Sequence, residues 1–324
     1  MLHSKQIEAD YGPFLSRLSS RFEGADLAIA NMEFTLAGEP YTGYPAFSAP
    51  DAYAEYVHQQ GINVFLTANN HILDKGQDGL VRTLSVYDRM EQEGKIRYTG
   101  ISKDIHQDTC TNPLLFNIRG IRLALINFTY GTNAGSSHAW PKVNRMNRIS
   151  ILPAIERAKR AKADFIIALP HWGMEYQLEH SECQEEMATW LAQNGVDVIV
   201  GAHPHVVQDY EKIQVQEEDG KMRTVPVFYS MGNAISNMSA ENTRLELMVR
   251  LNFTRDLENQ KEFLEPEAEF LWCTLPGRLV NSYCTIPVKD YIDRRKDWLL
   301  PSDYDNMMKT YWRVKKSSGI EDNK

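Results

Sequence analysis

Groups of histidine, asparagine and glutamate follow short apolar runs at five points of the 324-residue chain. The clearest examples are Asn70 and His71 after one run, His171 after another, and His203 and His205 after a third. Imidazole nitrogens combined with carboxylate and amide oxygens suit Zn, Mn or Fe better than Ca or Mg. Because His203 and His205 are two residues apart, their imidazoles can reach two neighbouring ions. Two ions ~3.5–4 Å apart can activate a water molecule and stabilise both oxygens of an in-line displacement at phosphorus.

Three carboxylates accompany these motifs. Glu33 follows an earlier apolar run, Asp74 lies three residues after His71, and Glu175 lies four residues after His171. A histidine without such surroundings is more often a packed or surface residue than a ligand. Four histidines are of this kind and are assigned no role: His58, His106, His138 and His180.

Other catalytic motifs are absent from the sequence. It contains no GxSxG nucleophile elbow, no GxxxxGK[ST] phosphate loop and no GxGxxG after a predicted strand. A serine hydrolase and a nucleotide-cradling fold are therefore disfavoured. The net charge of −8 provides no basic field to attract nucleic acid, so we expect no nucleic-acid partner.

The apolar runs that precede the polar motifs have the composition of strands buried on both faces, being rich in β-branched residues and bounded by polar breaks. Ligands of α/β proteins bind outside the carboxyl ends of such strands, so we expect the motifs to meet at one edge of a sheet. The predicted strands are residues 25–30, 62–67, 121–128, 164–169, 196–201 and 225–230.

Helical patterns alternate with these runs, which predicts an α/β fold with buried sheets. A glycine suited to a helix C-terminus follows three of the patterns, at Gly61, Gly94 and Gly195. After about residue 240 the pattern changes to antiparallel strands and a terminal helix. The predicted helices of the first part are residues 51–61, 79–94, 149–163 and 181–195.

The cysteines are widely spaced and form no CxxC pair or zinc-ribbon pattern. We expect buried free thiols, and a Cys273–Cys284 bridge stays open as an alternative. No segment approaches the ~18 consecutive apolar residues of a transmembrane helix, so the chain as given is expected to be soluble.

In chain order, these motifs resemble those of the bacterial capsule-synthesis CapA family of the poly-γ-glutamate type, a branch of the calcineurin-like metallophosphoesterases. The resemblance extends over residues 25–235. The matching segments are NMEFT at 31–35, ANNHILDKG at 68–76, HWGMEY at 171–176, GVDVIVGAHPHVVQ at 195–208 and YSMGNAI at 229–235.

The resemblance implies a metallophosphatase-like, four-layer α/β/β/α sandwich, which we expect to form one domain over residues 1–324. Its core motifs lie at 25–235, and C-terminal strands and a helix at 240–315 complete it. The family also implies a centre of two divalent metal ions, Mn, Fe or Zn. The implied metal ligands are Asn70, His171, His203 and His205, with Glu33 in place of the bridging aspartate of the wider superfamily.

The resemblance assigns other residues to catalysis or positioning. His71 is expected to contact the leaving oxygen or the phosphoryl oxygens, and Glu175 and Asp74 to orient ligands. Asn233 is expected to close the site or to position a loop.

The beginning of the chain departs from the family pattern. The family normally starts with an apolar strand ending in Gly-Asp, followed by Met-x-His, and here Met1-Leu2-His3 resembles only the end of this motif. His3 is therefore counted among the candidate metal ligands, while the first strand and its aspartate are expected to be lacking. Either a truncated start or a natural variant explains this, and with one carboxylate fewer we expect weaker metal binding.

The function expected from the resemblance is metal-assisted hydrolysis of a phosphoester or a related bond, in the biosynthesis of a poly-γ-glutamate capsule. The alternative is a non-enzymatic accessory subunit of a capsule polymer synthase or export complex. Expected partners are an anionic polymer or a phosphoester substrate, and membrane synthase subunits. Since family members are often anchored at the cell surface, localisation is left open.

Overall fold

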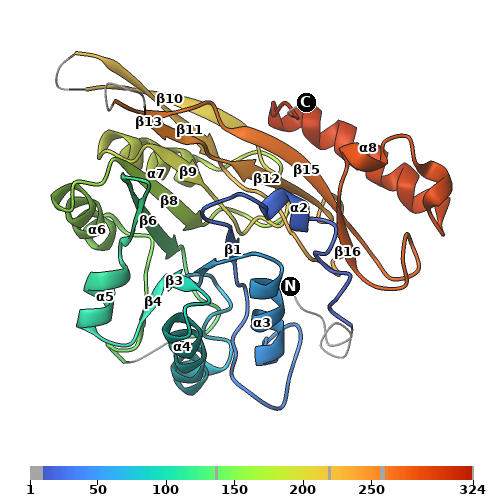
Figure 1. Cartoon of the computed structure of the whole chain (residues 1–324), viewed down its shortest axis with the longest axis horizontal. Helices are drawn as coiled ribbons and strands as arrows, with labels where there is room; N and C mark the ends of the chain where they lie inside the picture. The colour runs from blue at the N-terminus through green and yellow to red at the C-terminus, as the bar shows by residue number, and fades with distance from the viewer. Residues whose placement is uncertain (1–9, 136–137, 218–219, 256–259, 323–324) are drawn as a thin grey trace.

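The computed structural model describes residues 10–135, 138–217, 220–255 and 260–322. His3 and the expected departure at the start of the chain lie outside these residues. Within them, parallel strands alternate with helices up to about residue 230, and antiparallel strands and a long helix follow (Figure 1). The predicted mixed α/β fold is thereby confirmed.

The largest sheet of the described residues has six strands in the order β10-β11-β9-β8-β6-β5. Its four inner strands are parallel, and β5 and β10 are antiparallel edge strands. The strands are β5 (Leu114–Ile118), β6 (Ile121–Thr129), β8 (Phe165–His171), β9 (Val198–Val200), β10 (Tyr210–Gln216) and β11 (Met222–Phe228).

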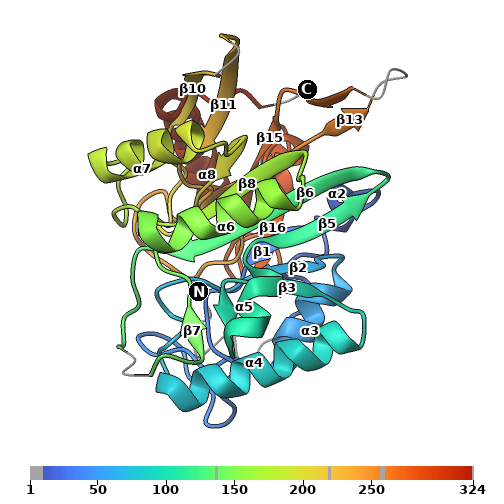
Figure 2. The same cartoon turned by 90° about the vertical axis from the view of Figure 1, so that its left-hand side faces the viewer.

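Two helices cover one face of this sheet, α6 (Arg148–Arg160) and α7 (Glu182–Gln193) (Figure 2). Their apolar faces form a core with alternate residues of the strands, for example Ile155 and Leu191 with Ile126. Asn147 caps the N-terminus of α6 by accepting a hydrogen bond from the Ser150 backbone N–H, at 2.8 Å.

The opposite face of the six-stranded sheet packs against a second set of strands. A parallel sheet contains β1 (Ile29–Asn31), β2 (Val64–Leu66) and β3 (Arg97–Thr99). An antiparallel sheet contains β12 (Leu245–Arg250), β15 (Glu267–Thr274) and β16 (Cys284–Pro287). Successive residues of a strand face opposite sides. Leu66 and Trp272 accordingly join the core shared with the six-stranded sheet, whereas Phe65 and Cys273 join a core on the other side.

Helices surround the second set of strands. α3 (Asp51–Gln59) and α4 (Gly76–Gln92) pack on the core that contains Phe65, and α8 (Pro301–Ser318) packs beside β15 on the shared core. The remaining elements are short: α2 (Ser19–Phe22), α5 (Ile105–Thr111), β4 (Ile101–Ser102) paired with β7 (Lys142–Val143), β13 (Phe253–Arg255) paired with β14 (Lys261–Phe263), and the 3-10 turns η1 (Lys289–Tyr291) and η2 (Arg295–Asp297).

The glycines predicted to end three helices have left-handed backbones. The φ angles of Gly61, Gly94 and Gly195 are 104°, 70° and 96°. L side chains rarely adopt such angles, so glycine suits these helix ends.

The expectation for the cysteines is half wrong. All four are free thiols, so the alternative Cys273–Cys284 bridge is not formed, and only these two are buried. Cys110 and Cys183 are exposed.

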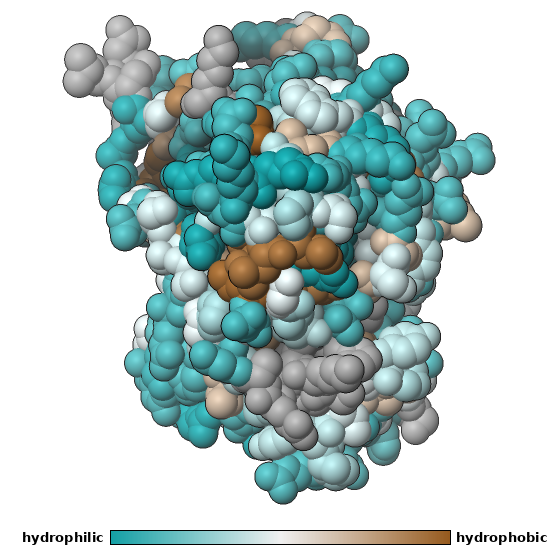
Figure 3. Space-filling model, turned by 90° about the vertical axis from the view of Figure 1, so that its right-hand side faces the viewer, coloured by the Kyte–Doolittle hydropathy of each residue, from teal (hydrophilic) through white to brown (hydrophobic). Residues whose placement is uncertain are grey.

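Among the residues that the structure describes, no helix is both long enough and apolar enough to span a membrane. The face in Figure 3 is mostly hydrophilic and carries one apolar patch near its middle.

Candidate metal centre

The polar motifs converge at the carboxyl ends of strands from both sheets. Glu33 follows β1, Asn70 follows β2, His171 is the last residue of β8, and His203 and His205 follow β9. β8 and β9 are parallel neighbours, as are β1 and β2, so each pair of loops leaves its sheet in the same direction. The sheet edges therefore bring together residues from four separate parts of the sequence.

Glu33, His171 and His203 form a first group of potential ligands, with one ligand atom of each within 4.8 Å of the others. The Nε2 atom of His171 lies 3.8 Å from Oε1 of Glu33 and 2.9 Å from Oδ1 of Asn70. The amide oxygen of Asn70 therefore faces the same point as this first group.

Glu175, His203 and His205 form a second group with the same spacing, and His203 belongs to both. The Nε2 atom of His205 lies 3.9 Å from Oε1 of Glu175 and 3.8 Å from Oε1 of Glu33. The two groups are thus parts of one continuous cluster, and Glu175 lies among potential ligands.

Three atoms of this cluster are buried without a hydrogen-bond partner among the described residues: Glu33 Oε1, His203 Nδ1 and His205 Nε2. Leaving a buried polar group unsatisfied costs ~1–3 kcal/mol, and such groups are rare in folded proteins. All three are lone-pair donors of the kinds that Zn, Mn and Fe bind. The residues present therefore fit the expected divalent ions.

Burial also prepares two imidazoles for metal binding. It lowers the pKa of His171 and that of His203 to about 3, because a charged ring loses its hydration. Both rings are neutral at pH 7, which is the form that binds metal ions.

The backbone after β9 is strained where it presents its two histidines. The φ angles of His203 and His205 are 107° and 59°, in the left-handed region that residues with a side chain seldom occupy. Such conformations cost ~1–3 kcal/mol each and persist only where the surroundings enforce them. At Gly201, a Cβ atom would lie 2.2 Å from the Tyr229 carbonyl oxygen and 2.4 Å from Nε1 of Trp172, so only glycine fits there.

Asn233 fixes the orientation of His205. Its Oδ1 lies 2.9 Å from Nδ1 of His205, while its Nδ2 donates to the carbonyl oxygens of His205 and Thr243. When Nδ1 of His205 donates to this amide, the lone pair of Nε2 is left for a metal ion.

His71 lies beside the cluster with its ring held by two residues. Its Nδ1 is 2.6 Å from Oδ2 of Asp74, and the edge of the Phe47 ring packs against it at 4.6 Å between centroids. Asp74 also accepts a hydrogen bond from the Phe47 backbone N–H, at 2.8 Å. Asp74 thus contacts His71 and belongs to neither ligand group, which is the geometry of a positioning residue.

The loop that carries Glu175 is exposed but anchored. The side chain of Glu175 is 41% exposed. Nε2 of the buried Gln208 donates to the carbonyl oxygens of Gln177 and Glu179, both at 3.0 Å. Gln184 in α7 in turn donates to Gln208 at 2.8 Å, so a buried amide chain ties the loop to the helix.

Sequence reasoning assigned no role to several residues around the cluster, among them Asn31 of the quoted motif NMEFT. Asn31 Nδ2 lies 3.3 Å from Oε2 of Glu33, and Asn133 Nδ2 lies 3.2 Å from Nδ1 of His71. The half-exposed Tyr130 ring packs on His203, with 4.6 Å between centroids. The signal for Tyr130 was available, because it lies just after the predicted strand at 121–128 as the other motifs follow theirs.

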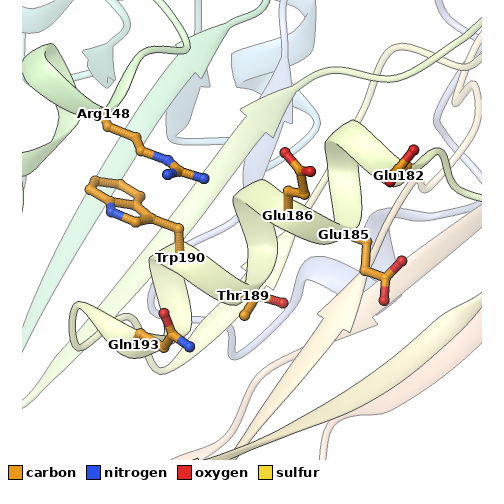
Figure 4. A pocket seen from close by; sticks show the side chains of 7 residues that line it. All are labelled: Arg148, Glu182, Glu185, Glu186, Thr189, Trp190 and Gln193. Atoms are coloured by element: carbon orange, nitrogen blue, oxygen red, sulfur yellow. The ribbon is translucent and has the colours of Figure 1, made fainter.

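The pocket in Figure 4 is lined by other residues than these. It runs along α7, where Arg148 stacks on Trp190 beside three glutamates, and none of the predicted site residues lines it. We therefore assign it no part in the cluster.

Two characterised relatives are similar in sequence. The capsule biosynthesis protein CapA of Bacillus anthracis is 28% identical over 261 residues, which is 76% of this chain and 60% of the relative. The PGA biosynthesis protein CapA of Bacillus subtilis (strain 168) is 29% identical over 195 residues, or 60% of this chain and 47% of the relative. The chain therefore spans about half to three-fifths of the length of these relatives.

Two solved structures resemble this chain at low sequence identity. A 5'-nucleotidase precursor from Thermus thermophilus is 15% identical with a TM-score of 0.48, covering 93% of this chain and 52% of that protein. The NAD nucleotidase NadN of Haemophilus influenzae is 15% identical with a TM-score of 0.49, covering 94% and 61%.

The profile of the bacterial capsule synthesis protein PGA_cap family matches residues 1–238. The chain belongs to this family of bacterial capsule synthesis proteins.

Proposed function

We propose that this chain is a divalent-metal-dependent hydrolase of the phosphoesterase type, acting in the biosynthesis of a poly-γ-glutamate capsule. The observation that carries the proposal is the pair of ligand groups sharing His203, whose buried atoms lack partners among the described residues. Membership of the capsule synthesis family supports the biological role.

In this proposal, the ions are held by six side chains and supply charge stabilisation and water activation. Because the Nδ1 proton of His71 is held by Asp74, the Nε2 atom of the ring is left to exchange a proton with a substrate oxygen. The proposed metal ligands are Glu33, Asn70, His171, Glu175, His203 and His205.

The proposed architecture is the four-layer α/β/β/α sandwich of metallophosphatases. Three buried cores support it: one between α6, α7 and the six-stranded sheet, one between the two sets of strands, and one beneath α3 and α4. Such a sandwich gives two sheets whose strand ends meet at one edge.

The proposed substrate is an anionic polymer or a phosphoester, and membrane synthase subunits are proposed as partners. The alternative is an accessory subunit without catalytic activity, and the test must distinguish it from a hydrolase. It would keep its partner contact when His205 is replaced, whereas a hydrolase would lose turnover.

The test measures metal content by plasma mass spectrometry and hydrolysis of p-nitrophenyl phosphate with Mn, Fe or Zn. We expect bound metal and turnover in the wild-type chain, both lost in His205→Ala. The matched control is His106→Ala, which changes an exposed histidine of α5 and should keep both. A folded wild-type chain that binds no metal would overturn the proposal and favour the accessory subunit.

A further inference from the structure

Arg145 lies in line with His171 across the carboxyl edge of the six-stranded sheet. Thr129, the last residue of β6, stands opposite His171 in parallel register, and it forms a parallel bridge with Arg145 on its other side. Adjacent strands are ~4.8 Å apart, so the Cα atoms of Arg145 and His171 are roughly 10 Å apart. Residues directly opposite each other share a face, so both side chains leave on the side of the ligand cluster.

The guanidinium of Arg145 is partly buried and has almost no partner. Its Nη2 donates to Oγ1 of Thr132 at 2.7 Å, which is its single hydrogen bond with the described part of the chain. No carboxylate of the described residues lies within 4.0 Å of it. Burial lowers the pKa of Arg145, but an arginine stays charged at neutral pH.

Two other partly buried arginines of this chain are paired with carboxylates. Arg244 makes two hydrogen bonds of 2.7 Å to the carboxylate of Asp303, and Arg82 binds both carboxylate oxygens of Asp51. A buried charge without a counter-charge is costly. Arg145 has no such carboxylate among the described residues and lies in line with His171, so its place suits an anion that the chain itself does not supply.

The residues around Arg145 connect it to the ligand cluster. It donates to Thr132, and the next residue, Asn133, donates its backbone N–H to the Asn70 carbonyl oxygen at 2.8 Å. The side chain of Asn133 reaches His71, and the ring of Tyr130 packs on His203. The loop of residues 130–133 thus runs from Arg145 to the proposed ligands.

We propose that Arg145 binds a second anionic group of a substrate whose first anionic group lies at the metal centre. Guanidinium pairs with carboxylate and phosphate in the same two-pronged geometry. The substrate class is therefore a compound or polymer with at least two phosphate or carboxylate groups several ångströms apart. This inference rests on the proposed metal centre and adds the substrate class to it.

The test compares ligands that differ only in the second group, by titration calorimetry on the full chain with Mn. Phenylphosphonate has one anionic group, 4-carboxyphenylphosphonate adds a carboxylate, and 1,4-phenylenediphosphonate adds a phosphonate. We expect Arg145→Gln to weaken at least one two-group ligand about tenfold and to leave phenylphosphonate within about twofold. Arg145→Lys should keep part of the affinity.

The one-group ligand also reports on folding, because its unchanged affinity shows an intact centre. The matched control is Arg148→Gln, which removes an exposed cation three residues away and should change none of the affinities. If Arg145→Gln loses the same affinity for one-group and two-group ligands, or loses none, the role of Arg145 is overturned and the metal-centre proposal still stands. If the wild-type chain binds no phosphonate, the metal-centre proposal fails and this inference fails with it.

Discussion

Two buried polar regions of this chain differ in whether their polar groups have partners within the chain. Where α8 meets β12, Arg244 pairs with both oxygens of Asp303, donates to the Cys273 carbonyl and lies over the Trp272 ring at 4.4 Å. In the ligand cluster, the atoms Glu33 Oε1, His203 Nδ1 and His205 Nε2 are buried without such partners. The polar groups of the first region are paired within the chain, whereas those of the second would be completed by the ions of the proposed function.

The difference indicates that the buried polar groups have different roles in the two regions. A satisfied network stabilises the fold, and breaking it exposes the cost of burying a charge. An unsatisfied cluster costs stability until its ligand binds, which selection for folding alone does not explain. Mutations should therefore affect folding in one region and ligand binding in the other.

The largest effect is expected from His203, which belongs to both ligand groups. Each bound ion at one hundred times its dissociation constant stabilises the folded state by about 2.7 kcal/mol, so two ions that share His203 contribute about 5.4 kcal/mol. Adding Mn should therefore raise the Tm of the wild-type chain, and His203→Ala should abolish this rise. The measurement is thermal unfolding with Mn and with EDTA.

The metal-free Tm supplies the control for this experiment. His203→Ala removes a buried nitrogen without a partner and keeps the strained backbone, so its Tm in EDTA should stay close to that of the wild type. A Tm increase with Mn that survives in His203→Ala would contradict its position in both groups.

Breaking the completed region should give the opposite result. Asp303→Ala leaves the guanidinium of Arg244 buried without its partner, which typically costs ~3–5 kcal/mol of the free energy of unfolding. Urea denaturation measures this loss, and metal content per folded chain should stay unchanged. A variant with wild-type stability would show that the pair adds nothing.

A smaller effect is expected from the positioning residue Asp74. Asp74→Asn keeps the shape but weakens the hold on Nδ1 of His71, so turnover of p-nitrophenyl phosphate should fall about 10- to 100-fold. The metal content should remain that of the wild type, because Asp74 belongs to neither ligand group. Loss of metal in this variant would instead make Asp74 part of the metal centre.

The smallest effect concerns Glu246 in β12, whose buried Oε2 lacks a partner among the described residues. Burial raises the pKa of Glu246 well above its ordinary value. The folded state then holds a proton that the unfolded state releases, so stability falls as the pH rises above the ordinary pKa. Glu246→Gln should remove this fall and gain about 1 kcal/mol at pH 8 over wild type. Urea denaturation of both proteins at pH 5 and pH 8 measures the difference. An equal change in the free energy of unfolding between the two pH values for wild type and variant would refute the prediction.

The sequence predicted the inner strands well because continuous apolar runs have few alternatives. It missed the edge strands β5 and β10, in which exposed residues alternate with buried or partly buried ones. Such strands are defined by their neighbours rather than by their own composition.

The candidate site was also predictable in part, where its residues directly follow predicted strands. Strand ends identified Glu33, Asn70, His171, His203 and His205, and the structure brings them together. The support from Asn133 was missed, since it depends on a loop returning from a neighbouring strand to Asn70.

The most direct test of the central claim is the anomalous scattering of Mn in crystals grown with saturating Mn. We predict anomalous peaks at the two ligand groups, one among Glu33, His171 and His203 and one among Glu175, His203 and His205. Glu33→Gln should weaken the first peak. Crystals in which neither group holds an ion would contradict the account.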